Sequence, residues 1–91
     1  MIVPISINLK MFYVYVLRSI KTRRYYIGSC KNTTVRFKQH NMGNVKSTKS
    51  YMPWLLVHQE SFATLSEDRK REKQIKNWKK RSAIERLLKH F

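Results

Sequence analysis

Acidic residues are scarce and unevenly distributed in this chain of 91 residues. Five Asp and Glu stand against twenty Lys and Arg, which gives a formal net charge of +15 at pH 7. No acid precedes residue 60, and the five are Glu60, Glu67, Asp68, Glu72 and Glu85. Two-metal hydrolytic sites usually gather several carboxylates from different elements, and glycosidases need two carboxylates that flank a sugar. The distribution argues against both classes, and it favours a site with one metal ion or none.

Cysteine is nearly absent, and there are only two glycines and two prolines. The single Cys30 excludes an internal disulfide and fits a reducing compartment, so we expect a cytoplasmic protein with no disulfide partner. The three histidines are scattered and no second cysteine accompanies them, which argues against a structural zinc site. No segment approaches the roughly 18 apolar residues of a transmembrane helix, so we expect no membrane insertion.

The length allows one small domain. Residues 1–10 are mildly apolar and lack the basic start of a signal peptide, and Met11 directly precedes the first strong pattern. We therefore expect residues 1–10 to be a leader outside the fold and residues 11–91 to form a single domain. Its core is thin, which leaves room for a weak homodimer beside the monomer. The strong positive field favours a polyanionic partner, with nucleic acid ahead of an anionic membrane surface.

Local patterns predict an α+β fold with a small three-stranded sheet flanked by helices, in the order β-β-α-β-α-α. Strands are expected at residues 12–17, 24–27 and 54–60, and the first lacks polar alternation, as in a strand covered on both faces. Gly28 is expected to end the second strand. Asn32 is a good N-cap for a helix over residues 33–40. Capping-box patterns open helices at Thr64, reaching about residue 79, and at Ser82.

Tyrosines form the first group that could carry chemistry. Alternate strand residues share a face, so Tyr13 lies with Tyr15, and Tyr26 lies with Gly28. One interpretation is the ordinary preference of aromatic residues for strands. The other is that two tyrosines line one face of the sheet, where the positive field and a neighbouring histidine would lower the pKa of a phenol.

Arg36 and His40 form the second group, because they lie four residues apart on one flank of the expected helix. They are either a solvated face or a pair in which Arg36 points toward the sheet and grips a phosphate. Glu72 is the third candidate, since helical spacing places it on the same inward arc as Leu65 and Ile75. It would pair there with a basic residue or with a metal ion. Asp68 shares this arc, but its place in the first turn is explained by the helix dipole alone.

The ordered series of motifs resembles the GIY-YIG endonuclease superfamily. The resemblance is closest to small single-domain bacterial members that are similar to the nuclease domain of the repair excinuclease. The matching stretches are YVY at 13–15, YIG at 26–28, Arg36 with His40, Asn41 and Gly43, PW at 53–54, and REK at 71–73 followed by Ile75, Lys76 and Trp78. Each motif alone is weak, but their order and spacing match over residues 12–89.

The resemblance implies a metal-dependent DNA endonuclease that hydrolyses phosphodiester bonds with one Mg²⁺ or Mn²⁺. By position, Glu72 would hold the metal and Arg36 would stabilise charge on the phosphate. Tyr15 or Tyr26 would activate or orient water, and His40 would assist proton movement. The expected nucleic-acid contacts are Lys31, Lys46, Thr48, Lys49, Arg71 and Lys76.

The chain departs from the family pattern at two positions. Tyr13 replaces the glycine of the first motif, and Ser29 replaces the lysine that follows the second motif in the excinuclease. We also expect no added DNA-recognition domain, so we expect cleavage to be nonspecific or structure-selective, with a place in DNA repair or recombination. The alternative is a non-catalytic basic module that binds nucleic acid on the same scaffold. Such a module needs the Lys and Arg residues but not Glu72.

Overall fold

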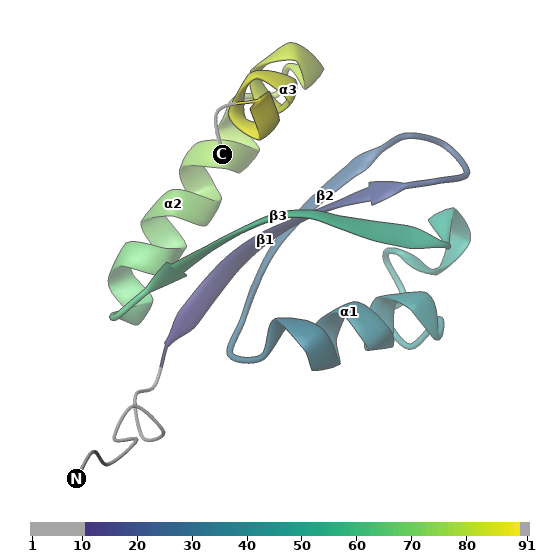
Figure 1. The fold of residues 1–91 in the computed structure, drawn as a ribbon, viewed down its shortest axis with the longest axis horizontal. Helices are drawn as coiled ribbons and strands as arrows, with labels where there is room; N and C mark the ends of the chain where they lie inside the picture. The colour runs from purple at the N-terminus through teal and green to yellow at the C-terminus, as the bar shows by residue number, and fades with distance from the viewer. Residues whose placement is uncertain (1–10, 90–91) are drawn as a thin grey trace, which may run out of the picture.

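The computed structural model describes residues 11–89, so the expected leader at residues 1–10 lies outside the described residues. Figure 1 shows an antiparallel sheet with helices on both sides. The elements are β1 (Phe12–Ser19), β2 (Tyr25–Cys30), α1 (Thr33–Asn41), the short 3-10 helix η2 (Lys49–Tyr51), β3 (Trp54–Phe62), α2 (Leu65–Asn77) and α3 (Arg81–Lys89). The α+β class and the order β-β-α-β-α-α are confirmed.

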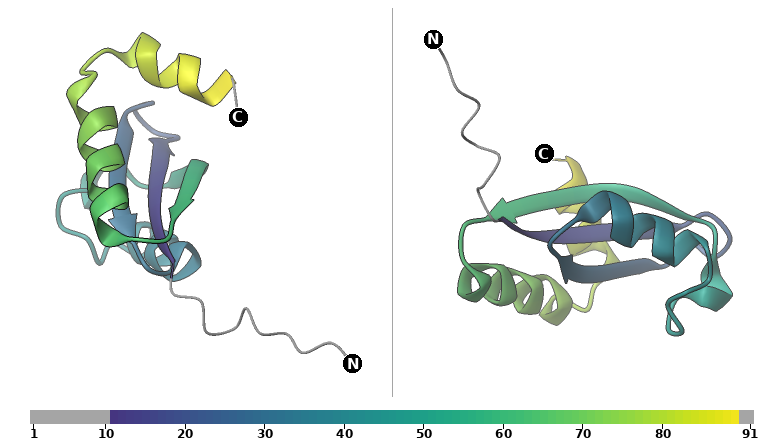
Figure 2. Two further views of the ribbon diagram at one scale, coloured as in Figure 1. Left: turned by 90° about the vertical axis from the view of Figure 1, so that its left-hand side faces the viewer. Right: turned by 90° about the horizontal axis from the view of Figure 1, so that it is seen from below.

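Strand β1 is the centre of the sheet, whose strand order is β2-β1-β3. It pairs antiparallel with both neighbours, and its residues Val14, Tyr15, Val16 and Leu17 are all buried. The expected strand covered on both faces is therefore confirmed, because helices pack against each side of the sheet (Figure 2).

The two faces of β1 belong to two separate hydrophobic clusters. Val14 and Val16 pack with Ile75 of α2 and with Ile84 and Leu87 of α3. On the other face, Tyr15 and Leu17 pack with Trp54, and the partly buried Phe37 of α1 and Tyr51 of η2 cover them. The sheet thus separates a face covered by α2 and α3 from a face covered by α1.

The starts of α1 and α2 follow their capping signals, whereas α3 begins at Arg81, so Ser82, the predicted start of the last helix, lies inside it. The Asn32 side chain accepts a hydrogen bond from the backbone N–H of Val35 at 3.1 Å, and Thr64 Oγ1 accepts one from the backbone N–H of Glu67 at 3.2 Å. These bonds satisfy backbone donors that the first helical turn leaves unpaired. The expected loop before β3 contains η2, and the Asn41 side chain closes it through hydrogen bonds with both backbone groups of Trp54.

Gly28 does not end the second strand as predicted. It lies inside β2, opposite Tyr15 of β1. A Cβ atom on Gly28 would meet the Tyr15 hydroxyl oxygen at 2.5 Å, so this position requires glycine for close packing and not for a turn.

Strand β2 is an edge of the described sheet, and its side chains alternate between the two faces. Tyr26 and Cys30 pack on the α1 side, whereas Ile27 packs on the α2 side, and Ser29 bonds to side chains of α2. The edge of β2 is therefore where the two faces of the sheet meet. Within residues 11–89, no helix combines the length and the apolar character needed to cross a membrane.

Candidate active site

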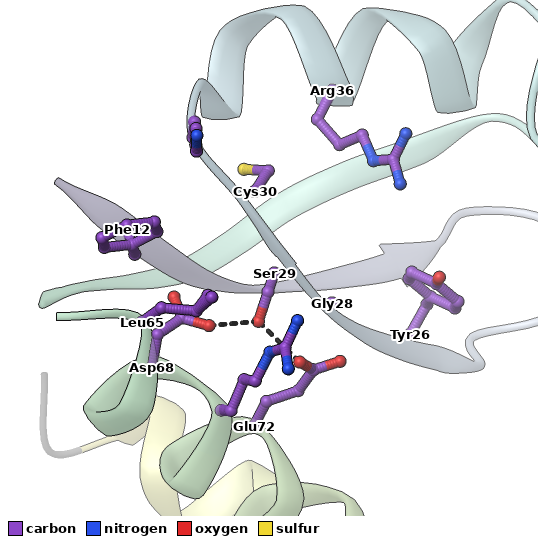
Figure 3. Close-up of a pocket in the computed structure, with 11 residues that line it drawn as sticks. Phe12, Tyr26, Gly28, Ser29, Cys30, Arg36, Leu65, Asp68 and Glu72 are labelled. Carbon is purple, nitrogen blue, oxygen red and sulfur yellow. Dashed lines mark hydrogen bonds between the residues drawn. The ribbon is translucent and has the colours of Figure 1, made fainter. Parts of the chain in front are cut away.

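A pocket of about 560 Å³ lies along the edge of β2, between α1 and α2. Its lining includes Tyr26, Gly28, Ser29, Arg36, Asp68 and Glu72. Figure 3 shows Arg36 approaching from α1 and Glu72 from α2, with β2 passing between them. Arg36, Tyr26 and Glu72, three of the five predicted catalytic residues, thus line one pocket although they come from three elements.

Tyr15 and His40 lie behind this pocket and are joined by a hydrogen bond. The Tyr15 hydroxyl is 2.9 Å from His40 Nε2, and His40 Nδ1 is 2.7 Å from Thr48 Oγ1. Thr48 Oγ1 donates its hydrogen to the carbonyl oxygen of Val45, so it accepts from Nδ1–H of His40. His40 Nε2 is then the acceptor for the Tyr15 hydroxyl. The network assigns this tautomer, and all three side chains in it are buried.

Burial sets the protonation of this pair. It raises the pKa of Tyr15 to about 12, although the Arg36 guanidinium acts in the opposite direction. The expectation that the positive field would lower the pKa of a phenol is therefore wrong for Tyr15, because removal from water outweighs the nearby charge. Burial, followed by repulsion from Arg36, lowers the pKa of His40, which keeps the imidazole neutral at pH 7.

Tyr26 lines the pocket, whereas Tyr15 is only 1% exposed. The two tyrosines lie on the same face of the sheet, which agrees with the second of the two interpretations left open by the sequence, and their ring centroids are 6.3 Å apart. The Tyr26 ring also lies 5.0 Å from that of His40. Of the two tyrosines proposed from the sequence to act on water, Tyr26 is thus the one that borders the open space.

Arg36 is half-buried and points from α1 toward the pocket (Figure 3). Its Nη1 donates to Gln39 Oε1 at 3.1 Å, while its Nε is buried and has no hydrogen-bond partner among the described residues. The sequence left open whether Arg36 lay on a solvated face or turned toward the sheet, and the structure has it turned toward the sheet. A guanidinium that lines a pocket can bind a phosphate anion through its N–H donors.

Of the two partners predicted for Glu72, a basic residue or a metal ion, the structure contains the basic residue, and Ser29 is a further partner. Glu72 Oε2 is 2.6 Å from Lys76 Nζ, and its Oε1 accepts a hydrogen bond from Ser29 Oγ at 2.6 Å. Burial acts to raise the pKa of Glu72, but the hydrogen bonds from Lys76 and Ser29 outweigh it and the pKa is lowered. Glu72 is therefore a carboxylate at neutral pH.

Asp68 is a member of this site that the sequence reasoning assigned to the helix dipole. It is fully buried, and its Oδ1 lies 2.5 Å from the same Ser29 Oγ that bonds to Glu72. Its Oδ2 has no hydrogen-bond partner among the described residues. The signal in the sequence was its place one helical turn before Glu72, but its burial and its contact with Ser29 depend on how α2 packs on β2.

The predicted nucleic-acid contacts have different environments. Lys31, Lys46 and Lys49 are exposed. Thr48 is only 1% exposed and supports His40, so its side chain faces the interior. Lys76 is exposed but paired with Glu72.

Arg71 makes a bidentate contact with a carboxylate of the sheet. Its Nε and Nη2 donate to the two carboxylate oxygens of Glu60 at 2.9 and 3.1 Å. The guanidinium also lies over the ring of Trp78 at 5.6 Å from the centroid. These contacts occupy the donors that a phosphate would use and join α2 to β3.

The donor set at the pocket suits a hard divalent cation. Glu72, Asp68 and Ser29 supply only oxygen atoms, which Mg²⁺ and Mn²⁺ prefer. The buried, unpartnered oxygen of Asp68 also fits a cation. Within the described chain, no group of three or more His, Cys, Asp or Glu side chains forms a larger candidate metal site.

The sequence of this chain is similar to those of known proteins. Residues 11–86 match the family described as the GIY-YIG catalytic domain. A UPF0213 protein of Staphylococcus haemolyticus (strain JCSC1435) is 34% identical over 76 residues, which cover 82% of this chain and 92% of that protein. A UPF0213 protein of Staphylococcus aureus (strain Mu3) is 36% identical over 78 residues, which cover 85% of this chain and 93% of that protein. No solved structure matches the chain significantly. The chain therefore belongs to the GIY-YIG family of nuclease catalytic domains.

Proposed function

We propose that this protein is a metal-dependent DNA endonuclease that hydrolyses phosphodiester bonds in a nonspecific or structure-selective manner. The observation that carries the proposal is the convergence of Arg36, Tyr26 and Glu72 on one pocket at the edge of β2. A cationic group, a hydroxyl and a carboxylate in one pocket are groups that can promote phosphodiester hydrolysis, by stabilising charge and by moving protons. Membership of the GIY-YIG family supports the same chemistry.

We assign Arg36 to binding the phosphate group of the substrate. Arg36 lines the pocket, where its charge would stabilise the negative charge that develops on the phosphate oxygens. Because Arg36 is half-buried, less water competes for its guanidinium, which strengthens this interaction.

Glu72 is assigned to holding one Mg²⁺ or Mn²⁺. Such an ion, when bound, offsets phosphate charge and makes a bound water more acidic. Lys76 is the partner that a cation would have to displace or share, since Lys76 Nζ lies on Glu72 Oε2. The lowered pKa of Glu72 keeps the carboxylate ready for a cation at neutral pH.

Hydrolysis forms a bond between a water oxygen and phosphorus and breaks one ester bond, so the water loses a proton and the leaving oxygen gains one. Tyr26 is assigned to orienting that water, because it borders the pocket. Tyr15 and His40 are assigned to positioning Tyr26, whose ring lies 5.0 Å from the His40 ring. The high pKa of Tyr15 argues against its use as a base at neutral pH.

The net charge of +15 supplies the attraction to DNA. The exposed side chains Lys31, Lys46 and Lys49 are assigned to phosphates of the backbone. Contacts of this kind carry no sequence information, which agrees with nonspecific or structure-selective cleavage. A preference for flaps or branches would support a role in repair or recombination.

The test is cleavage of labelled single-stranded, duplex, flap and branched DNA with Mg²⁺, Mn²⁺ or EDTA. We expect products with either metal and none with EDTA, and we expect Glu72→Gln to abolish cleavage while DNA binding is kept. Glu85→Gln is the matched control, because it removes the same charge from an exposed residue of α3 that pairs with Arg81. Salt-sensitive binding without cleavage by the wild-type protein would instead favour the non-catalytic binding module.

A further inference from the structure

Asp68 occupies an unusual position for an acidic side chain. It is fully buried, it forms no ion pair with another described residue, and its Oδ2 has no hydrogen-bond partner. A buried carboxylate in this state is costly unless a positive charge or a donor reaches it. The helix dipole at the start of α2 is a weak compensation by comparison.

The contacts of Ser29 indicate where a positive charge would compensate the Asp68 carboxylate. Ser29 Oγ lies 2.5 Å from Asp68 Oδ1 and 2.6 Å from Glu72 Oε1. A serine hydroxyl has one hydrogen, so it can donate to only one of these oxygens at a time. At the other contact, the Ser29 oxygen faces a carboxylate oxygen with no hydrogen between them, so two acceptors are in contact. Three oxygen atoms are thus gathered at one point with a single hydrogen among them, and a cation would be favourable at that point.

The other acidic residues of the chain already have partners of their own. Glu60 binds Arg71, and Glu85 binds Arg81. Glu67 accepts a hydrogen bond from the Thr64 hydroxyl at the exposed start of α2. Because the protein carries a net charge of +15, a divalent cation is repelled at long range and needs concentrated local negative charge. Asp68 and Glu72 bring two carboxylates together at Ser29. Lys76, which pairs with the second oxygen of Glu72, is the charge that a cation would have to displace or share.

We infer that Asp68 is the second carboxylate of the divalent-cation site, acting with Glu72 and Ser29. The inference rests on the proposed function in one respect, since the cation is the one assigned to Glu72. Asp68 and Glu72 lie one helical turn apart on α2, and both line the pocket with Ser29 (Figure 3). All three supply oxygen, so the site selects Mg²⁺ or Mn²⁺ over metals that prefer nitrogen or sulfur.

The experiment measures Mn²⁺ binding to the free protein without DNA, by loss of the electron paramagnetic resonance signal of aqueous Mn²⁺ and by calorimetry. We expect Asp68→Asn to weaken Mn²⁺ binding by about tenfold or more. Glu67→Gln is the matched control, because it removes the same charge from the adjacent exposed residue. It should leave the affinity for Mn²⁺ within about twofold of wild type, since its carboxylate lies outside the pocket.

Folding is followed in the same samples by thermal unfolding. Without metal, Asp68→Asn should melt at the same temperature as wild type or higher, because the substitution removes an uncompensated buried charge. Mn²⁺ should raise the melting temperature of wild type more than that of Asp68→Asn. Ser29→Ala, which removes the bridging hydroxyl and keeps both carboxylates, should also weaken Mn²⁺ binding.

The possible outcomes separate this inference from the proposed nuclease. Equal Mn²⁺ affinity for wild type and Asp68→Asn would overturn the role of Asp68, as would a wild-type protein that binds no Mn²⁺ in the absence of DNA. EDTA-sensitive cleavage could still be found in either case, and the nuclease proposal would then stand. Weaker Mn²⁺ binding by Asp68→Asn in a protein that cuts no DNA would support the cation site and refute the nuclease.

Discussion

The hydroxyl of Tyr15 lies 2.9 Å from Nε2 of His40, and both side chains are buried between β1 and α1. This bond joins two residues that are 25 positions apart in the chain. It also continues through His40 Nδ1 to Thr48, so it connects the centre of the sheet with the segment that precedes β3. The polar side chains of Tyr15, His40 and Thr48, which lie behind Tyr26, are thus all hydrogen-bonded.

Tyr15→Phe should destabilise the protein. The substitution keeps the ring but removes the hydroxyl, which leaves His40 Nε2 buried without a donor. We expect the free energy of unfolding to fall by about 1–3 kcal/mol, measured by urea denaturation at neutral pH. Tyr13→Phe is the matched control, because Tyr13 lies on the same strand and is half-buried. Equal stability of Tyr15→Phe and wild type would show that the bond contributes nothing.

Gly28→Ala should also destabilise the protein, by about 1–3 kcal/mol through overpacking. The new methyl group would meet the Tyr15 hydroxyl oxygen at 2.5 Å and the ring carbon Cζ at 2.6 Å. Because the ring carbon is as close as the oxygen, adding Tyr15→Phe should not restore stability. Thermal unfolding of the single and double variants tests this. Recovery in the double variant would mean that the hydroxyl alone opposes the methyl group.

Stability should fall as the pH drops below the ordinary histidine value of 6.5, because the folded state lowers the pKa of His40. Below this pH, His40 binds a proton more readily in the unfolded chain than in the folded chain, so protonation favours unfolding. The loss continues until the pH reaches the lowered pKa of His40. Glu60 and Glu72 also have lowered pKa values, but their contribution is lost below 4.5 and not in this window.

The variant His40→Gln tests whether His40 is the source of this dependence of stability on pH. Glutamine supplies polar atoms without titrating, so the free energy of unfolding should change less between neutral and mildly acidic pH than it does in wild type. An unchanged slope in the variant would assign the effect to another group. Urea denaturation at a series of pH values supplies the measurement.

Lys46→Ala and Lys49→Ala should weaken DNA binding with little effect on stability. Both side chains are exposed, and each phosphate contact that is removed should lower the slope of log affinity against log salt by about one. Fluorescence anisotropy with a labelled duplex at several salt concentrations measures this slope. A slope equal to that of wild type would exclude these lysines from the interface.

Arg71→Ala should act mainly on stability, although the sequence placed Arg71 among the DNA contacts. It would remove both hydrogen bonds to the Glu60 carboxylate and leave that half-buried group with His58 as its remaining partner. We expect a loss of about 1–3 kcal/mol in chemical denaturation. A change in the salt slope as large as that of Lys46→Ala, without a change in stability, would restore Arg71 to the interface.

Local signals were enough to predict the order of elements. Asn32 and Thr64 cap the helices that follow them, because a cap acts on backbone groups only three residues away. The apolar stretch at residues 12–17 indicated a covered strand, and it became the central strand of the sheet. The position of Gly28 was predicted less well, since close packing and a turn both favour glycine.

The sequence by itself determined the element order, the positive field and the residue types on the inward side of each helix. Only the tertiary structure decided what surrounds each group. Packing of α1 and η2 on the sheet buried Tyr15 and raised its pKa, and packing of α2 on β2 brought Ser29 between Asp68 and Glu72. Thr48 likewise became a partner of His40. Local patterns act over a few residues, whereas burial depends on contacts between residues far apart in the chain, and burial controls charge and hydrogen bonding.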